Sequence, residues 1–188
     1  TAATASEIEF FVQHLKAHFV EQAPNVFQNR SFEIQIIICG VGMMQTAFCL
    51  GTRMSIAKAD VAIQAGIAGA FDQNLNLGDV VAVSSECFGD FGAEDHESFL
   101  DIFDLGFENA NQLPFAQGLL INQSPMWMGA ALPLVSSLSV NTVSGAQHTI
   151  DKRLKKFNCQ IENMEGIAFH YACIKLGIPY LQIRAISN

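Results

Sequence analysis

The sequence predicts an α/β fold built on a mainly parallel β-sheet. Three observations lead to this prediction: apolar runs of strand length, glycine-containing segments directly after two of them, and apolar stripes at helical spacing. Strands that form continuous apolar runs are buried on both faces, and their alternation with helices is typical of α/β proteins. No linker, repeat or low-complexity tract divides the 188 residues, so we expect a single domain over 1–188.

The first element that we expect is a helix from Glu7 to Phe19. Its apolar residues recur at helical spacing, and Thr4 or Ser6 stands where a capping hydroxyl would begin the helix. The stripe consists of Ile8, Phe11, Val12, Leu15 and Phe19. The chain is therefore expected to begin with a helix.

A strand, a glycine turn and a helix are expected next. The β-branched run Ile34–Cys39 ends in Gly40-Val41-Gly42. Helical spacing then returns at Ala47, Leu50, Met54 and Ala57. Glycine in such a turn is first a backbone requirement, so the segment predicts a tight strand-to-helix connection.

A second strand is expected from Val61 to Ala65, followed by a second glycine turn at Gly66-Ile67-Ala68-Gly69-Ala70. Beyond the turn Leu77-Gly78-Asp79, the run Val80–Val83 predicts a third strand. The two glycine turns could also hold a phosphate group. Neither, however, matches the dinucleotide fingerprint or the P-loop with its lysine.

The segment 86–114 is rich in Asp, Glu, Asn, Gly and Phe without a steady period, which predicts a loop and a candidate lid. Met164–Leu176 is expected to be a helix because Gly177 follows it, with Pro179 two residues on. Tyr180–Ser187 then predicts a closing strand.

The composition excludes several classes of partner. There are 10 Lys and Arg against 18 Asp and Glu, which gives a formal net charge of -8 and disfavours nucleic acid and anionic membranes. The apolar runs are much shorter than the roughly 20 residues of a membrane span. Five cysteines without a C-x-x-C pair predict reduced thiols in a cytoplasmic protein.

Two groups of residues could bind a metal, but neither has a convincing ligand set. His14 and His18 lack a third ligand, and Glu94-Asp95-His96-Glu97 is more typical of a solvated loop. There is also no G-x-S-x-G motif and no cysteine with an obvious local base, so acyl transfer has no support. We expect no metal and no cofactor.

The segment with most functional information is Asn163–Ala168, followed by Arg184–Asn188. A glutamate at the start of a helix, such as Glu165, can simply complement the helix dipole. It can also serve chemistry. The residues alone leave both interpretations open.

These two stretches resemble the signatures of the nucleoside phosphorylase and nucleosidase superfamily, especially its methylthioadenosine/S-adenosylhomocysteine nucleosidases. Ala3–Glu7 resembles the turn after the family's first strand, and Gly40–Gly42 and Gly66–Gly69 resemble its glycine turn and base-side loop. The resemblance implies a three-layer sandwich with a central mixed, mainly parallel β-sheet flanked by helices. It also implies a homo-oligomer, dimer or larger, and a chain that lacks the family's first strand and last helix.

At the sugar end of the implied site, Glu7 matches the carboxylate that activates water, and Glu165 matches the one that holds the ribose hydroxyls. Arg184 resembles the residue that organises this end, and Met164 would pack beneath the sugar. Cleavage of a purine N-glycosidic bond builds positive charge on the ribose and negative charge on the base. The site therefore needs an anion near the sugar and a donor near the purine.

At the base end, Ala68 and Gly69 match backbone that faces the ligand, and His148 falls where relatives place an aromatic side chain against the base. Asn188 stands where adenine-directed relatives carry an aspartic acid that protonates the purine N7. An amide cannot act as that acid, but it can both donate and accept, which suits a 6-oxopurine such as hypoxanthine.

Asp101–Phe107 and Ile186-Ser187-Asn188 resemble the futalosine hydrolase branch in particular. The leading hypothesis is therefore a nucleosidase that hydrolyses futalosine and releases hypoxanthine, a step of menaquinone biosynthesis. Three alternatives remain: a methylthioadenosine/S-adenosylhomocysteine nucleosidase, a purine nucleoside phosphorylase, and a silent nucleoside-binding or storage protein. The phosphorylase would need cations for phosphate, and the glycine turns carry no arginine.

Overall fold

A computed structural model describes residues 1–56, 59–124 and 131–188 of the chain. Its centre is a six-stranded mixed sheet in the order β11-β4-β10-β9-β5-β8. The strands are β4 (Ala62–Ala70), β5 (Val80–Phe88), β8 (Leu120–Ile121), β9 (Leu134–Ser139), β10 (Ile161–Asn163) and β11 (Tyr180–Ile186). β11 also pairs with β5, so the sheet closes on itself. The α/β fold class is confirmed.

The sheet combines parallel and antiparallel ladders, and its two longest ladders, β11 with β4 and β5 with β9, are parallel. β11 runs parallel to β4 over its whole length, and β9 runs parallel to both β5 and β10. The antiparallel ladders of β10 with β4, β11 with β5 and β5 with β8 span only two or three residue pairs each. The sheet is therefore mixed.

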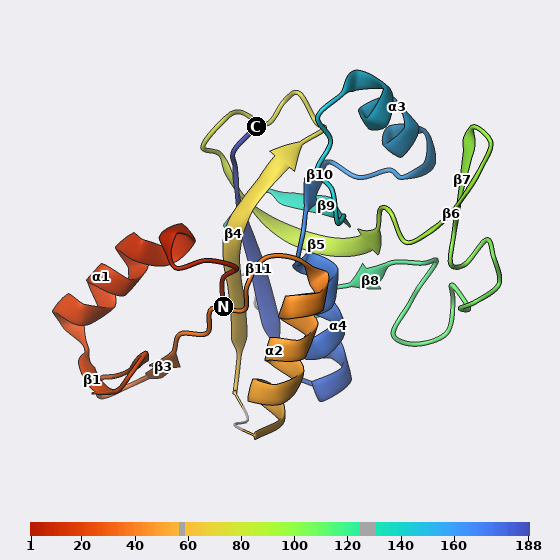
Figure 1. Ribbon diagram of the computed structural model, residues 1–188. Helices are drawn as coiled ribbons and strands as arrows, with labels where there is room; N and C mark the ends of the chain where they lie inside the picture. Colours follow the sequence, from red (N-terminus) through yellow and green to blue (C-terminus); the bar gives the residue numbers. More distant parts are fainter. Residues whose placement is uncertain (57–58, 125–130) are drawn as a thin grey trace.

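Two helices, α2 (Met43–Ile56) and α4 (Gly166–Leu176), lie side by side against the sheet (Figure 1). They share an apolar core that includes Leu50, Met54, Phe169 and Cys173. α4 begins two residues later than expected, and Gly177 ends it in the left-handed conformation (φ 65°) as predicted. The closing strand is also confirmed, while Ala57 of the predicted stripe lies outside the described residues.

The amino-terminal region differs from the prediction. A 3-10 turn, η1 (Ser6–Ile8), leads into α1 (Glu9–His18). Neither helix start has a side-chain cap, and the hydroxyl of Thr4 donates to the Glu7 carboxylate. A separate three-stranded sheet follows, formed by β1 (Val20–Ala23), β2 (Val26–Gln28) and β3 (Glu33–Gln35) (Figure 1). The predicted strand Ile34–Cys39 is therefore found only in part: its first two residues end β3, and the rest of the run makes one isolated bridge, between Ile38 and Ala2.

The predicted glycine turn at 66–70 is also wrong, because β4 runs straight through it. Glycine inside a strand can mark the close approach of another group. A Cβ on Gly66 would stand 2.5 Å from Nη1 of Arg184, and one on Gly69 would stand 3.0 Å from Nδ2 of Asn188. These glycines therefore leave room for side chains of the site.

The expected loop at 86–114 is only partly a loop. β5 extends through Phe88, and β6 (Gly92–Asp95) pairs with β7 (Ser98–Asp101) in a hairpin. A further helix, α3 (Gln147–Lys156), precedes β10 in the chain and lies above it in the view of Figure 1. None of the helices in the described residues is long and apolar enough to cross a membrane, and all five cysteines are free thiols.

Candidate active site

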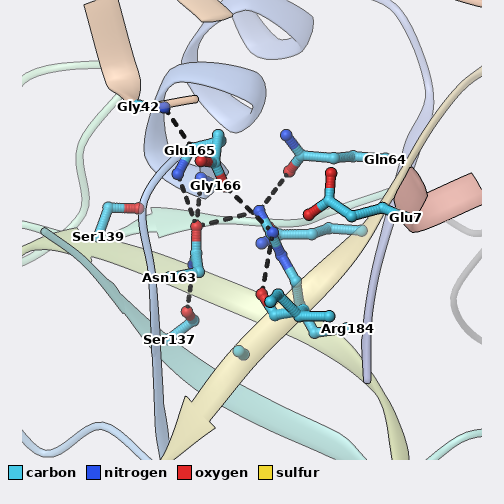
Figure 2. Close-up of polar contacts among 12 residues, drawn as sticks. Glu7, Gly42, Gln64, Ser137, Ser139, Asn163, Glu165, Gly166 and Arg184 are labelled. Atoms are coloured by element: carbon cyan, nitrogen blue, oxygen red, sulfur yellow. Dashed lines mark hydrogen bonds and ion pairs between the residues drawn. The ribbon is translucent and has the colours of Figure 1, made fainter. Parts of the chain in front are cut away.

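Three charged side chains from distant segments point toward one another in Figure 2. Glu7 belongs to η1, Glu165 directly precedes α4, and Arg184 lies in β11. The register of β11 on β4 sets Arg184 beside Gly66. A Cβ on Gly66 would lie 3.3 Å from Oε1 of Glu7, so the carboxylate and the guanidinium share the space above this glycine.

Arg184 is a buried cation whose side chain is held from several sides. Only 1% of its surface is exposed. Nη1 donates to Oε2 of Glu165 and to the Ile67 carbonyl, both at 3.2 Å. Nη2 donates to Oε1 of Gln64 and to Oδ1 of Asn163, both at 3.0 Å. A charge buried this deeply is tolerated only when it is paired and hydrogen-bonded, so these acceptors fix one orientation of the guanidinium.

Glu165 is fixed at both carboxylate oxygens. Oε1 accepts from the backbone N–H of Gly42 at 3.0 Å, and Oε2 accepts from Arg184. Gly42 has φ 94°, a conformation that glycine adopts without strain. The first glycine turn therefore supplies a donor to a carboxylate of the site.

Glu7 is half-buried and less constrained. Its Oε2 accepts from the backbone N–H of Thr4 at 2.7 Å and from the Thr4 hydroxyl at 3.2 Å. Among the described residues, these are the only hydrogen bonds of the Glu7 side chain, and they leave Oε1 facing the space above Gly66. An oxygen in that position can accept a proton from a water molecule.

The sequence prediction gave no role to Asn163, which caps α4. Its Oδ1 accepts from the backbone N–H of Glu165 at 2.9 Å and of Gly166 at 2.6 Å. Its Nδ2 donates to Oε1 of Glu86 and to Oγ of Ser137, both at 2.7 Å. An Asn just before a helical stripe is a recognisable capping signal, so this role could have been found from the sequence.

Glu86 was also missed, because it fell inside the segment expected to be a loop. It is fully buried and accepts further bonds from Oγ of Ser139 at 2.8 Å and Nε2 of Gln182 at 2.9 Å. Burial raises the pKa of Glu86 above its ordinary value, while the bonds from Gln182 and Ser139 and the charge of Arg184 act in the opposite direction.

The residues of the base end lie closer to the surface. Asn188 is exposed, its Oδ1 accepts from the Ser187 hydroxyl at 3.0 Å, and its amide lies over Gly69. The backbone N–H of Ser187 donates to the Ala68 carbonyl at 2.9 Å, which continues the β11–β4 ladder and brings these residues together. The half-buried Met164 directly precedes Glu165.

His148 is exposed on the first turn of α3. There it borders an open cavity of about 390 Å³ that Phe99, Lys152 and Phe157 also line. Its position on a surface helix separates it from the buried cluster around Arg184.

Comparison with known proteins shows the family of the chain. The family model described as "Phosphorylase superfamily" matches residues 1–188. The chain belongs to the phosphorylase superfamily. Among curated members, a futalosine hydrolase of Thermus thermophilus is 28% identical over 152 residues, covering 79% of this chain and 66% of its own length. A futalosine hydrolase of Streptomyces coelicolor is 32% identical over 129 residues, covering 69% of this chain and 54% of its own length.

A third curated superfamily member, a 5'-methylthioadenosine/S-adenosylhomocysteine nucleosidase of Maridesulfovibrio salexigens, is 28% identical over 83% of this chain and 68% of its own length. A solved nucleosidase of the same name from Campylobacter jejuni aligns with TM-score 0.76 at 20% identity, over 100% of this chain and 83% of that chain. At such identity the solved structure shows the fold alone. This chain spans about two thirds of the length of the first futalosine hydrolase and about half of the length of the second.

Proposed function

We propose that this superfamily member is a nucleosidase that hydrolyses the N-glycosidic bond of futalosine, releasing hypoxanthine and dehypoxanthine futalosine. The observation that carries the proposal is the pair of carboxylates at one end of the sheet. Glu165 is fixed by Arg184 and Gly42, and Glu7 directs one oxygen into the neighbouring space. The names of the curated relatives support the same reaction class.

The two carboxylates have complementary roles in this reaction. Glu165 holds the ribose hydroxyls through charge-assisted hydrogen bonds and stabilises the positive charge that develops on the sugar. Glu7 removes the proton of the attacking water. Arg184 keeps Glu165 in place, and Met164 packs beneath the sugar. No step of this mechanism calls for a metal or a cofactor.

The choice of base rests on Asn188, with Ala68 and Gly69 supplying backbone toward the purine and His148 an aromatic ring against it. An amide can donate to O6 or N7 of hypoxanthine, whereas adenine-directed relatives need a protonated carboxyl group at this place. A methylthioadenosine/S-adenosylhomocysteine nucleosidase is the second candidate, favoured by the relative from Maridesulfovibrio salexigens. Asn188 favours futalosine over that candidate.

We further propose a cytoplasmic homo-oligomer, dimer or larger, in which the sheet is the middle layer of a three-layer sandwich. Two apolar side chains of α2, Met44 and Phe48, support an oligomer because they are 81% and 75% exposed in the single chain.

Chromatography of the products from futalosine, inosine and methylthioadenosine, with and without phosphate, tests the proposal. We expect free hypoxanthine from futalosine at a rate that phosphate does not change. Formation of a sugar 1-phosphate would instead indicate a phosphorylase, and release of adenine alone would indicate the second candidate. If no free base is released from any of the three nucleosides, the remaining interpretation is a nucleoside-binding or storage protein without activity.

A further inference from the structure

A buried carboxylate that the proposed chemistry does not use lies beneath the sugar end of the site. Glu86 has no exposed surface, and its hydrogen-bond donors come from three other strands. Ser139 reaches it from β9, Asn163 from β10 and Gln182 from β11. A buried acid without such partners would be strongly destabilising, so the arrangement around Glu86 must form as a unit.

The orientation of the Asn163 amide follows from its neighbours. Its oxygen faces three N–H donors, namely the backbone of Glu165, the backbone of Gly166 and Nη2 of Arg184. A flipped amide would turn its own NH2 group toward these donors. The NH2 group must therefore find acceptors on the opposite side, where Oε1 of Glu86 stands at 2.7 Å.

The space around Glu86 leaves little freedom for the start of α4. A Cβ on Gly166 would lie 1.8 Å from Oε1 of Glu86, so the helix begins in direct contact with this carboxylate. The residue just before Gly166 is Glu165, the carboxylate assigned to the ribose. A shift of Glu86 would therefore displace Glu165, both through Asn163 and through the backbone at Gly166.

We propose that Glu86 is a positioning residue of the sugar end, which orients Asn163 and through it holds Glu165 and Arg184 in register. This inference rests on the proposed nucleosidase function. Glu86 itself is sealed from solvent and acts only through Asn163 and the first residues of α4. Its removal should therefore weaken the recognition of the ribose more than any other step.

Two substitutions separate the acceptor from the bulk of the side chain. Glu86→Met keeps a flexible chain of similar length but removes both acceptor oxygens, and we expect kcat/KM for futalosine to fall about 10- to 100-fold. Glu86→Gln keeps an oxygen that can face Asn163 and Gln182 while its NH2 group faces the Ser139 hydroxyl. We expect this variant to stay within about fivefold of the wild type.

The preference for a ribose hydroxyl, measured as the ratio of kcat/KM for the ribonucleoside over that for the 2′-deoxynucleoside, would not change if Glu86 only stabilised the fold. The wild type should cleave futalosine faster than its 2′-deoxy analogue, and Glu86→Met should shrink this preference by about fivefold or more. An equal loss for both substrates would overturn the proposal. A wild type that cleaves neither substrate would refute the proposed function, and the positioning role with it.

Glu162 provides a matched control on β10, the strand that also carries Asn163. It is 2% exposed, but its carboxylate bonds to Ser144 and Arg153 rather than to Asn163. Glu162→Met should lower the melting temperature and leave the ribose preference unchanged. A preference that shrinks equally in both Met variants contradicts the proposal.

If Glu86→Met does not fold, Ser137→Ala takes its place, because Ser137 is the other acceptor of the Asn163 NH2 group at 2.7 Å. This small change should shrink the ribose preference about twofold or more. An unchanged preference would show that the orientation of Asn163 does not control the ribose.

Discussion

The sugar end and the base end of the site differ in how firmly the fold holds them. At the sugar end, Glu165 and Arg184 are 5% and 1% exposed and are bonded to groups from several strands. At the base end, Asn188 is exposed and His148 lies on α3, a helix with no buried residue. In the proposed function, the residues that act on the ribose, which all nucleosides share, are therefore buried, whereas the residues proposed to recognise the base lie at the surface, where substitutions should disturb the fold little.

The largest effect is expected from Arg184→Met. This change leaves the Glu165 carboxylate buried without its cation and removes the donor to Gln64 and Asn163. Breaking a buried pair from one side should lower the free energy of unfolding by about 3–5 kcal/mol and abolish measurable turnover. Urea denaturation and the product assay check both effects. An Arg184→Met protein as stable as the wild type would contradict the claim that the fold holds the sugar end more firmly than the base end.

Glu7→Gln should separate catalysis from stability. Glu7 is half-buried and, among the residues that the structure describes, bonds only to Thr4, so we expect the free energy of unfolding to change by less than about 1 kcal/mol. Turnover should fall by roughly 100-fold or more with substrate binding largely intact, as for the loss of a positioned base. Steady-state kinetics gives both values, and a nearly wild-type turnover would reject Glu7 as the base.

Asn188→Asp addresses the base end. We expect the ratio of kcat/KM for futalosine over its 6-amino counterpart to narrow by about tenfold or to reverse, because a donor or acceptor that the bound purine covers and leaves unpaired costs about 1–3 kcal/mol. The melting temperature should not change, since the side chain is exposed. If both proteins discriminate equally, Asn188 does not read the base.

The smallest effect is expected at His148. His148→Ala should raise KM by about two- to fivefold through the loss of a ring contact with the base, and His148→Phe should restore the wild-type value. Stability should be unaffected in both variants, because α3 contributes no buried residue to the core. A KM that stays constant through both changes would remove His148 from the site.

The elements predicted correctly from the sequence are those whose signals are local. α4 has a helical period and a glycine stop at Gly177, β11 is an apolar run of strand length, and both are found. The prediction of a turn at 66–70 is wrong because Gly66 is there to make room for Arg184. Arg184 lies on β11, whose pairing with β4 cannot be read from the local sequence. Ladders of two or three residue pairs, such as that of β10 with β4, leave no period in the sequence, so the mixture of directions could not be derived from the apolar runs.

In the candidate site, too, residues within short local motifs could be predicted, whereas residues defined by distant partners could not. The resemblance of short motifs located Glu7, Glu165 and Arg184, which the structure brings together. Glu86 could not be found in this way, because its partners are 53, 77 and 96 residues away along the chain. The hydrogen-bond partners of a buried acid can be identified only once the pairing of the strands that carry them is known.

The measurement that tests the central claim most directly compares the wild type and Glu165→Gln on futalosine and its 2′-deoxy analogue. We expect the wild type to prefer the ribonucleoside clearly. Glu165→Gln should lower kcat/KM for futalosine by about 100-fold and lose most of that preference, since the neutral amide weakens both the hydroxyl contact and the stabilisation of the sugar cation. A wild type that cleaves the 2′-deoxy analogue equally well, or a Glu165→Gln protein that retains the wild-type preference, would contradict the assignment of Glu165 to the ribose.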